Sequence, residues 1–265
     1  MNFITLDYLD IGLASLTIAV NAGLSIAMNL GLGQRLVISA GRMVAQLILI
    51  GLVLKALFSI ASPFLTGAAI IIMILFAGRE AMARQERRFR GWWSYGLGTG
   101  SMMAAGLIIM VFGLTTQISP DPWYDPRYAI PLMGMILGNT MNGVSIGLDR
   151  MISGMVERRA SIEARLCLGE EAREAFRPVV RAALRAAFIP TINGMSAAGI
   201  VSLPGMMTGQ ILAGADPVEA VKYQIMIMFL IAGGTGIGSF VAIFFAQHRL
   251  TDARHRLRLD RLVST

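Results

Sequence analysis

Long apolar runs, broken by short polar connections, follow one another along the whole chain. Between Asp10 and Arg79 there is no acidic residue, and the only basic residues are Arg35, Arg42 and Lys55. A helix needs about 20 apolar residues to cross roughly 30 Å of hydrocarbon. Runs close to that length predict seven membrane-spanning helices, at 11–30, 36–58, 62–77, 98–116, 129–148, 192–213 and 223–246.

The composition supports this pattern. Of the 265 residues, 55% are hydrophobic and 15% are charged, and the mean hydropathy is +0.65. A soluble domain carries about 25% charged residues and cannot cover this much apolar surface. The sequence therefore predicts an all-α, polytopic membrane protein in which residues 1–265 form a single transmembrane domain.

Basic residues gather on one side of the predicted membrane domain. Alternate connections and the tail at 247–265 hold 19 of the 23 lysines and arginines. Positive charge stays in the cytoplasm, so we expect an inner- or plasma-membrane protein with its N-terminus outside and its C-terminus cytoplasmic. The pI near 10.3 then reflects topology and contact with membrane lipid, and it requires no nucleic acid. Residues 1–7 hold no basic segment ahead of an apolar one, so the first span is expected to be retained.

The sequence excludes several kinds of chemistry. Its two lysines, Lys55 and Lys222, do not complete a GxxxxGK[ST] phosphate loop. Its two histidines, His248 and His255, lie in the tail, and no paired-cysteine or HExxH metal motif is present. No acid falls in the middle of a predicted span, where proton-coupled carriers generally need one. We therefore expect neither an enzyme nor a resident cofactor or metal in this chain, and transport would need an outside source of energy.

The longest predicted connection, at about 149–188, contains elements of its own. Gly169 suits the left-handed position that ends a short helix over 161–168, in which Cys167 is expected to be a small apolar filler. Pro178 is expected to open a further segment over 178–188 at the level of the lipid headgroups, with its arginines toward phosphate. An ordinary solvated connector is the alternative.

Two sets of residues carry a resemblance to a known family. Glu163-Ala164-x4-Gly169 is similar to the EAA loop of ABC-transporter permeases, although Arg165 stands where that loop has its second alanine. The runs 141–150, 190–195 and 199–214 resemble FetB-type iron-export permeases, which are related to plant aluminium-tolerance permeases. The resemblance implies a homodimer working with an ABC-type ATPase subunit, which would hold ATP and Mg²⁺. It also implies that Glu163, Ala164 and Gly169 couple the two proteins.

Polar residues within the spans are the candidates for a translocation path. Pro204 removes a backbone hydrogen bond, so the sixth predicted span should bend or unwind there, against protein or a water-lined cavity. Arg42 could touch an anionic substrate or could reach the headgroups. The other candidates carry amide or hydroxyl groups, which could also serve helix packing alone; they are Asn139, Asn142, Asn193, Ser202, Thr208 and Gln210.

Two functional readings stay open on the sequence. The first is a transporter permease that moves iron, a chelated metal or an organic anion. The second is a membrane scaffold or regulatory subunit that recruits a soluble partner without transport. Glycine pairs four residues apart are expected to serve helix packing under either reading; they are Gly96/Gly100, Gly134/Gly138, Gly205/Gly209 and Gly234/Gly238.

Overall fold

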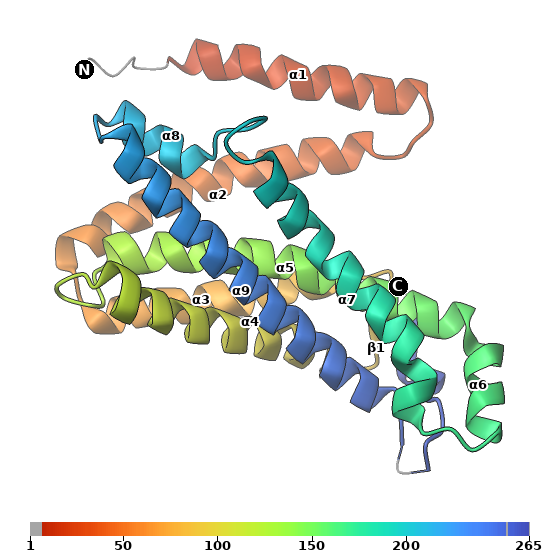
Figure 1. Cartoon of the computed structure of the whole chain (residues 1–265). Helices are drawn as coiled ribbons and strands as arrows, with labels where there is room; N and C mark the ends of the chain where they lie inside the picture. Colours follow the sequence, from red (N-terminus) through yellow and green to blue (C-terminus); the bar gives the residue numbers. More distant parts are fainter. Residues whose placement is uncertain (1–6, 253, 265) are drawn as a thin grey trace. The chain divides into compact units, whose positions relative to one another are not determined.

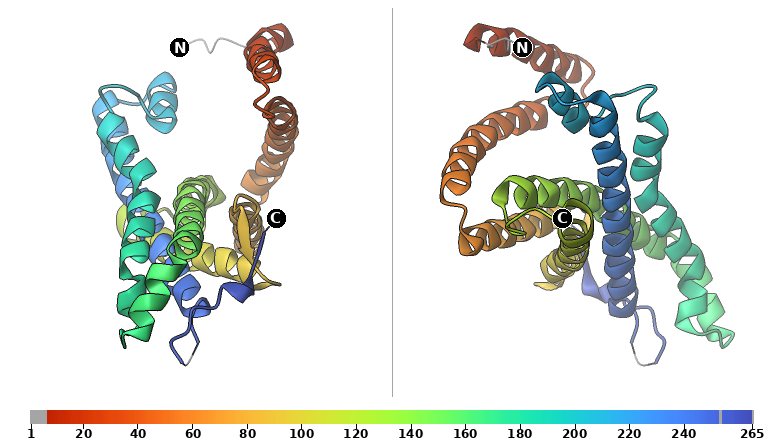
Figure 2. Two further views of the ribbon diagram at one scale, coloured as in Figure 1. Left: turned by 90° about the vertical axis from the view of Figure 1, so that its right-hand side faces the viewer. Right: turned by 60° about the vertical axis from the view of Figure 1, so that its left-hand side comes forward.

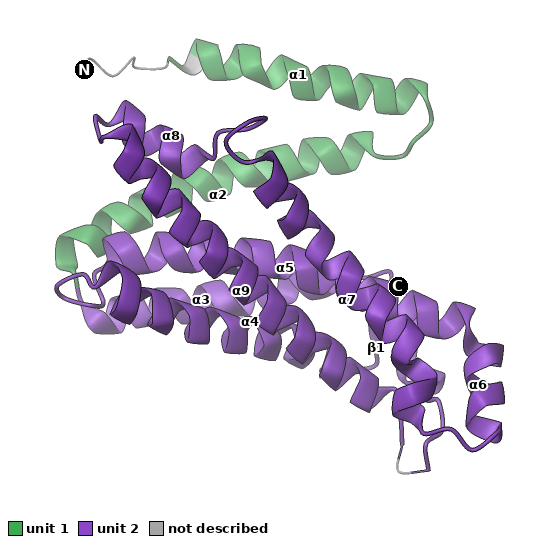
Figure 3. Cartoon of the chain, in the orientation of Figure 1, with its two compact units in different colours: residues 1–61 green, residues 62–265 purple. Residues whose placement is uncertain are grey.

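The computed structural model describes residues 7–252 and 254–264 and is almost wholly helical (Figure 1). The predicted start of the chain, at 1–6, lies outside the described residues. The chain divides into two compact units, Met1–Ala61 and Ser62–Thr265 (Figure 3). This division does not test the prediction of a single domain.

The first unit is a pair of long helices. α1 spans Tyr8–Ala27 and α2 spans Gly33–Ile60, so the first two predicted spans are confirmed. The connection turns through Asn29 and Gly31, which have φ values of 53° and 68°. At its end the backbone N–H of Leu32 donates to Ser25 Oγ at 3.0 Å.

The second unit holds seven more α-helices within the described residues and a small two-stranded sheet. β1 pairs with β2 in antiparallel fashion, with Arg88 opposite Val263. The elements of the unit are, in chain order, α3 Pro63–Ala83, β1 Arg87–Phe89, α4 Trp93–Phe112, the π-helical turn η1 Gly113–Ile118, α5 Pro126–Glu157, α6 Arg159–Cys167, α7 Ala172–Ala197, α8 Gly205–Leu212, α9 Pro217–Arg249, the 3₁₀ turn η2 Leu259–Arg261 and β2 Leu262–Ser264.

α5 is the central helix of this unit. It packs against α3, α4, α7 and α9, while α7 and α9 run beside each other (Figure 2). Met133, Ile136 and Met151 are 0% exposed. In a bilayer such side chains stabilise the unit through dispersion contacts with their neighbours, because the lipid hydrocarbon is as apolar as they are.

Glycines allow the close approach of α5 and α9. Thr140 lies between Gly234 and Gly238, where a Cβ on Gly238 would collide with its methyl group. A Cβ on Gly143 would lie 2.6 Å from Thr235 Cγ2. Of the four predicted pairs, Gly234/Gly238 is therefore closely packed on both members. Within the described residues no atom outside the helix lies within 4 Å of a Cβ position on either member of Gly96/Gly100 or Gly205/Gly209, or on Gly138.

The sixth predicted span, 192–213, is wrong as a single helix. α7 begins 20 residues earlier, at Ala172, and ends at Ala197, and the separate helix α8 begins at Gly205. The predicted interruption is confirmed, because residues 198–204 are not helical and Pro204 caps the start of α8.

The predicted start of a separate segment at Pro178 is also wrong, because residues 178–188 are helical, as predicted, but form the middle of α7. Pro178 and Pro190 both lie inside α7, and both are exposed. A proline interrupts helical hydrogen bonding on one side only, and here the antiparallel packing against α5 and α9 keeps the helix continuous.

Among the residues that the structure describes, five helices are long and apolar enough to cross a membrane: α1, α2, α3, α4 with η1, and α9. The fifth predicted span lies within α5, which has 32 residues, and the sixth involves α7, which has 26. At 1.5 Å per residue both reach about 39 Å or more, although their composition keeps them out of the first group. The all-α, polytopic membrane fold is confirmed.

We predict that Gly238→Val destabilises the second unit, because Thr140 leaves no space for a side chain. Overpacking of this kind costs about 1–3 kcal/mol. Thermal unfolding of the purified protein in detergent would measure the loss. Gly100→Val is the matched control, since it places the same residue in a helix whose Cβ position has no neighbour within 4 Å among the described residues. Equal stability of the two variants would contradict the prediction.

Candidate coupling surface

The predicted coupling residues lie at the far end of a helical arm. Arg84, at the end of α3, donates from Nη1 to Asn142 Oδ1 on α5 at 2.6 Å. From Asn142 to its end at Glu157, α5 continues for 15 residues, or about 22 Å. The chain then forms α6 and returns in α7, so α6 is the tip of the arm (Figure 1).

The arm is rigid because its two long helices are in close contact. A Cβ on Gly154 of α5 would lie 2.9 Å from Val179 Cγ1 on α7, and one on Gly147 would lie 3.1 Å from Ala187 Cβ. Phe176 is 0% exposed, and Ile162 anchors α6 at 3% exposure. A force applied to α6 would therefore act on α5 and α7 together.

α6 matches the predicted short helix to within two residues at either end. Gly169 follows it at φ +91°, in the left-handed region that the sequence predicted. Ala164 and Gly169 are exposed and Glu163 is half-buried, so all three are accessible from outside the arm. The expectation for Cys167 as a filler is wrong, because its side chain is exposed.

Charged pairs cover the surface of the tip. Arg159 Nε donates to Glu163 Oε1 at 2.8 Å, and Arg165 pairs with Glu170 at 2.7 Å. Such solvent-facing pairs contribute about 0–1 kcal/mol each. A carboxylate accepts several hydrogen bonds, so Glu163 can meet a partner's base without a large loss in stability.

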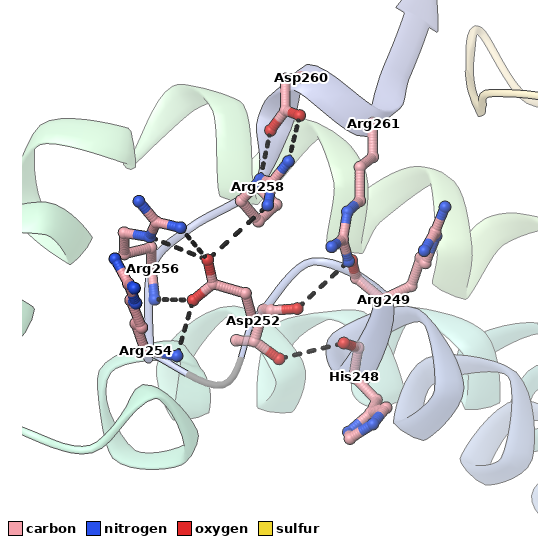
Figure 4. Close-up of polar contacts among 9 residues, drawn as sticks. His248, Arg249, Asp252, Arg254, Arg256, Arg258, Asp260 and Arg261 are labelled. Carbon is pink, nitrogen blue, oxygen red and sulfur yellow. Dashed lines mark hydrogen bonds and ion pairs between the residues drawn. The ribbon is translucent and has the colours of Figure 1, made fainter.

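The C-terminal tail forms hydrogen bonds with three other parts of the second unit. Arg261 Nη1 donates to the carbonyl oxygen of Arg249, at the end of α9, at 2.7 Å (Figure 4). The carbonyl of Arg261 accepts from Arg90 N at 2.8 Å, beside the β1–β2 pair. The N–H of Ala172, at the start of α7, donates to His255 Nδ1 at 3.4 Å. The tail therefore joins α9, the α3–α4 connection and the arm.

Asp252 organises the turn of the tail. Its Oδ1 accepts from the backbone N–H groups of Arg254 and Arg256, at 2.9 and 3.0 Å, and its Oδ2 accepts from Arg256 Nε at 2.8 Å (Figure 4). The hydrogen bonds from Arg256 are the main cause that holds the pKa of Asp252 far below its usual value. In the same turn, paired hydrogen bonds from Arg258 lower the pKa of Asp260 to about 2.

Aromatic residues lie at both ends of α4. The Arg249 guanidinium lies 4.5 Å from the centre of the Trp93 ring, and Trp92 stacks edge-on against Tyr95. Beyond the other end of α4, Trp123 stacks edge-on against Tyr124. Tryptophan and tyrosine favour the membrane–water interface, so we expect these two clusters to lie at the two boundaries of the bilayer.

The candidate path residues do not form one site. On α5, Asn142 pairs with Arg84, and Asn139 Nδ2 donates to the Met135 carbonyl at 2.8 Å. Asn193 and Ser202 are exposed on α7 and on the connection that follows it. Arg42 is exposed on α2, in the other unit.

Helix α8 and the residue that caps it contain three of the predicted path residues, which are Pro204, Thr208 and Gln210. Thr208 Oγ1 donates to the Pro204 carbonyl at 3.2 Å. Gln210 Oε1 is buried and has no hydrogen-bond partner among the described residues. The buried hydroxyl groups of Thr140, Thr235 and Ser239 also have none. Sequence reasoning missed these three, and the signal for two of them was available, because Thr140 lies between the two asparagines of α5 and Thr235 directly follows Gly234.

The described residues contain no group of three His, Cys, Asp or Glu side chains that could hold a metal ion.

Comparison with known proteins identifies the family. The profile described as uncharacterised protein family UPF0014 matches residues 8–251. The chain belongs to the UPF0014 family. It is 40% identical over 231 residues to the UPF0014 membrane protein slr1647 of Synechocystis, covering 86% of this chain and 87% of that protein. No solved structure matches it.

Two further UPF0014 relatives have descriptive names. The probable iron export permease protein FetB of Escherichia coli is 31% identical over 96% of this chain and 95% of its own length. The protein ALUMINUM SENSITIVE 3 of Arabidopsis thaliana is 31% identical over 83% of this chain and 79% of its own length. The resemblance to FetB-type permeases is confirmed, and the chain is an integral membrane protein of a permease family.

We predict that Asp252→Asn loosens the tail, because an amide cannot replace the charged acceptor of Arg256. The change should raise hydrogen–deuterium exchange of Arg90, Arg258 and Ala172 by about tenfold, the loss expected for one charge-assisted hydrogen bond. The low native pKa means that the carboxylate acts at neutral pH, and that its contribution is lost as pH falls below its ordinary pKa toward the native one.

Asp260→Asn is the control for this variant, since it removes only the pair with Arg258. It should leave exchange at Ala172 unchanged. Equal protection of all three amides in the native protein and in Asp252→Asn would show that Asp252 does not organise the tail.

Proposed function

We propose that this chain is the permease subunit of an ABC transporter that exports a solute across the inner or plasma membrane, using ATP hydrolysed by a separate subunit. The observation that carries the proposal is α6, a short exposed helix at the tip of a rigid arm, ended by Gly169 in the left-handed conformation. The name of the relative FetB, a probable iron export permease, supports the same function.

The arm supplies a mechanical route for coupling. α6 would seat in a groove of the ATPase, with Ala164 allowing close approach and Glu163 meeting a base of the partner. Closure of two ATPase subunits would then move a pair of arms, one from each copy of this chain. Because α5 packs tightly on α7 and α9, that movement would reach the membrane helices as a rigid-body shift.

The path is best sought at the interrupted helix. Residues 198–204 separate α7 from α8, and Gln210 carries a buried oxygen without a partner among the described residues. The amide of Gln210 and the hydroxyl of Thr208 on the same helix suit an organic anion or a chelated metal better than a bare iron ion, which prefers charged oxygen or nitrogen ligands.

The orientation of the chain can be tested directly. We predict that the arm and the tail are cytoplasmic, with the N-terminus outside, because Arg150 to Arg185 and the tail hold most of the positive charge. In a Cys167→Ser background, Glu171→Cys should resist a membrane-impermeant thiol reagent in intact cells, whereas Asp121→Cys should react. Reaction of Glu171→Cys at the same rate as Asp121→Cys would reverse the proposed orientation.

Coupling is tested by two variants at the tip. We predict that Glu163→Lys and Gly169→Val reduce solute-stimulated ATPase activity of the reconstituted complex at least tenfold. The lysine would repel a basic residue of the partner, and a valine at φ +91° carries a strong steric penalty. Both variants should insert normally into the membrane.

Matched controls exist around the start of α9, away from α6. Glu219→Lys breaks an exposed pair with Lys222, and Gly214→Val strains a glycine at φ +95°; both should retain activity. Full activity of the two tip variants would assign docking to another segment. ATPase activity that depends on the chain but responds to no solute would favour the scaffold function instead.

A further inference from the structure

A cavity of about 670 Å³ lies between α7 and α9 at the end nearest the tail. The two helices are antiparallel, because the ring of Phe188 packs on Gly236 and Met228 approaches Gly194. The start of α7 is therefore next to the end of α9 and the tail, and the two helices form the long walls of the cavity.

The chemistry of the lining changes along the length of the cavity. One end is polar and charged, with Arg173, Glu174, Arg177, His248 and Asp252. The other end is apolar, and its side chains are Val180, Leu184, Phe240, Ile243 and Phe244. A ligand that fills this groove would carry a charged group at one end and a hydrocarbon portion at the other.

The charged end favours an anion. Asp252 is already surrounded by Arg256 and Arg258, and Glu174 forms an ion pair with Arg177 at 3.1 Å. Arg173 adds a positive charge to this end. A second cavity, of about 310 Å³, lies directly beside this charged end, and Glu174, Arg177 and Arg181 are among the residues that line it.

The groove also lies at the level of a membrane boundary. His248 lines it, and the next residue, Arg249, lies over Trp93 in the interfacial aromatic cluster. Phe240 and Phe244 lie about two and a half and one and a half turns of α9 before Arg249 and are 56% and 65% exposed. The apolar end thus faces hydrocarbon while the charged end reaches the headgroup region.

We propose that this groove binds an anionic phospholipid of the cytoplasmic leaflet. The phosphate lies at Arg173 and Arg177, and one acyl chain follows Leu184, Phe240 and Phe244. Because the walls belong to the arm and to α9, the bound lipid bridges them just behind the coupling surface. This inference goes beyond the proposed transport function, and it can be tested in the absence of an ATPase.

The test uses the full chain, purified in mild detergent and examined by native mass spectrometry with added phosphatidylglycerol. The native protein should retain this lipid, and it should retain phosphatidylcholine with the same acyl chains far less. Arg173→Gln combined with Arg177→Gln should weaken retention about 25-fold, since each basic residue near a lipid surface contributes about fivefold. Equal retention of the two lipids, or unchanged retention by the double variant, would overturn the proposal.

The control double variant is Arg127→Gln with Lys222→Gln, which removes two exposed basic residues near the starts of α5 and α9, away from the groove. It should retain phosphatidylglycerol like the native protein. A loss equal to that of the groove variant would mean that total charge governs retention and would overturn the site. Thermal unfolding without added lipid confirms that each variant is folded.

A second variant separates a lipid from a free phosphate compound. Leu184→Trp narrows the apolar end and leaves every arginine in place, so it should reduce retention of phosphatidylglycerol. Glycerol 3-phosphate should not compete with the lipid for the native protein. Competition by glycerol 3-phosphate, or native retention by Leu184→Trp, would show that the acyl chain is not held in this groove.

Discussion

The close approach of α5 to α7 and α9 is the constraint on which the second unit depends. Helices in a bilayer gain no hydrophobic free energy from associating, so they associate through dispersion contacts and occasional hydrogen bonds. Gly143, Gly147 and Gly154 of α5, together with Gly234 and Gly238 of α9, let side chains of the facing helix enter the groove on its surface. The same contacts hold the arm straight beyond the end of α3. The packing of the second unit and the position of α6 therefore both depend on the contacts of α5 with α7 and α9.

The tail adds a second, polar level of organisation to these apolar contacts. The Arg261 side chain donates hydrogen bonds to the carbonyl oxygens of Arg249 and Thr251, at the end of α9 and just after it. Its backbone continues the β1–β2 ladder, and His255 accepts a hydrogen bond from the first N–H of α7. Each contact is weak in water. Together they require that the arm, α9 and the α3–α4 connection move as neighbours, which suits an element that transmits movement from a soluble partner.

The sequence predicted those features that depend on local chemistry. Gly169 predicted the end of α6, and the apolar runs predicted α1, α2, α3, α4 and α9 to within six residues at each end. Hydropathy failed where packing decides the structure. Pro178 suggested the start of a segment, yet contacts with α5 and α9 keep α7 continuous through it. The position of the tail could not be predicted, because the residues that pair, 87–89 and 262–264, are separated in the sequence by most of the chain. Likewise, the spacing of Gly96 and Gly100 is the same as that of Gly234 and Gly238, and only the folded neighbours distinguish them.

The connection between α7 and α8 pairs much of the backbone that a proline in a span would be expected to leave unpaired. A proline in a span suggests unpaired polar groups, which cost several kcal/mol each in hydrocarbon. Between α7 and α8, however, the N–H groups of Val201 and Ser202 both donate to the Ala197 carbonyl, and Gly199 N donates to the Ser202 carbonyl at 2.9 Å. The side chains of Ile200 and Val201 are apolar and are 92% and 81% exposed. This connection satisfies much of its own backbone and presents hydrocarbon outward, so it can lie at depth against lipid or a second copy of the chain. The group that indicates a path is instead the side-chain oxygen of Gln210 on α8, which is buried and has no hydrogen-bond partner among the described residues.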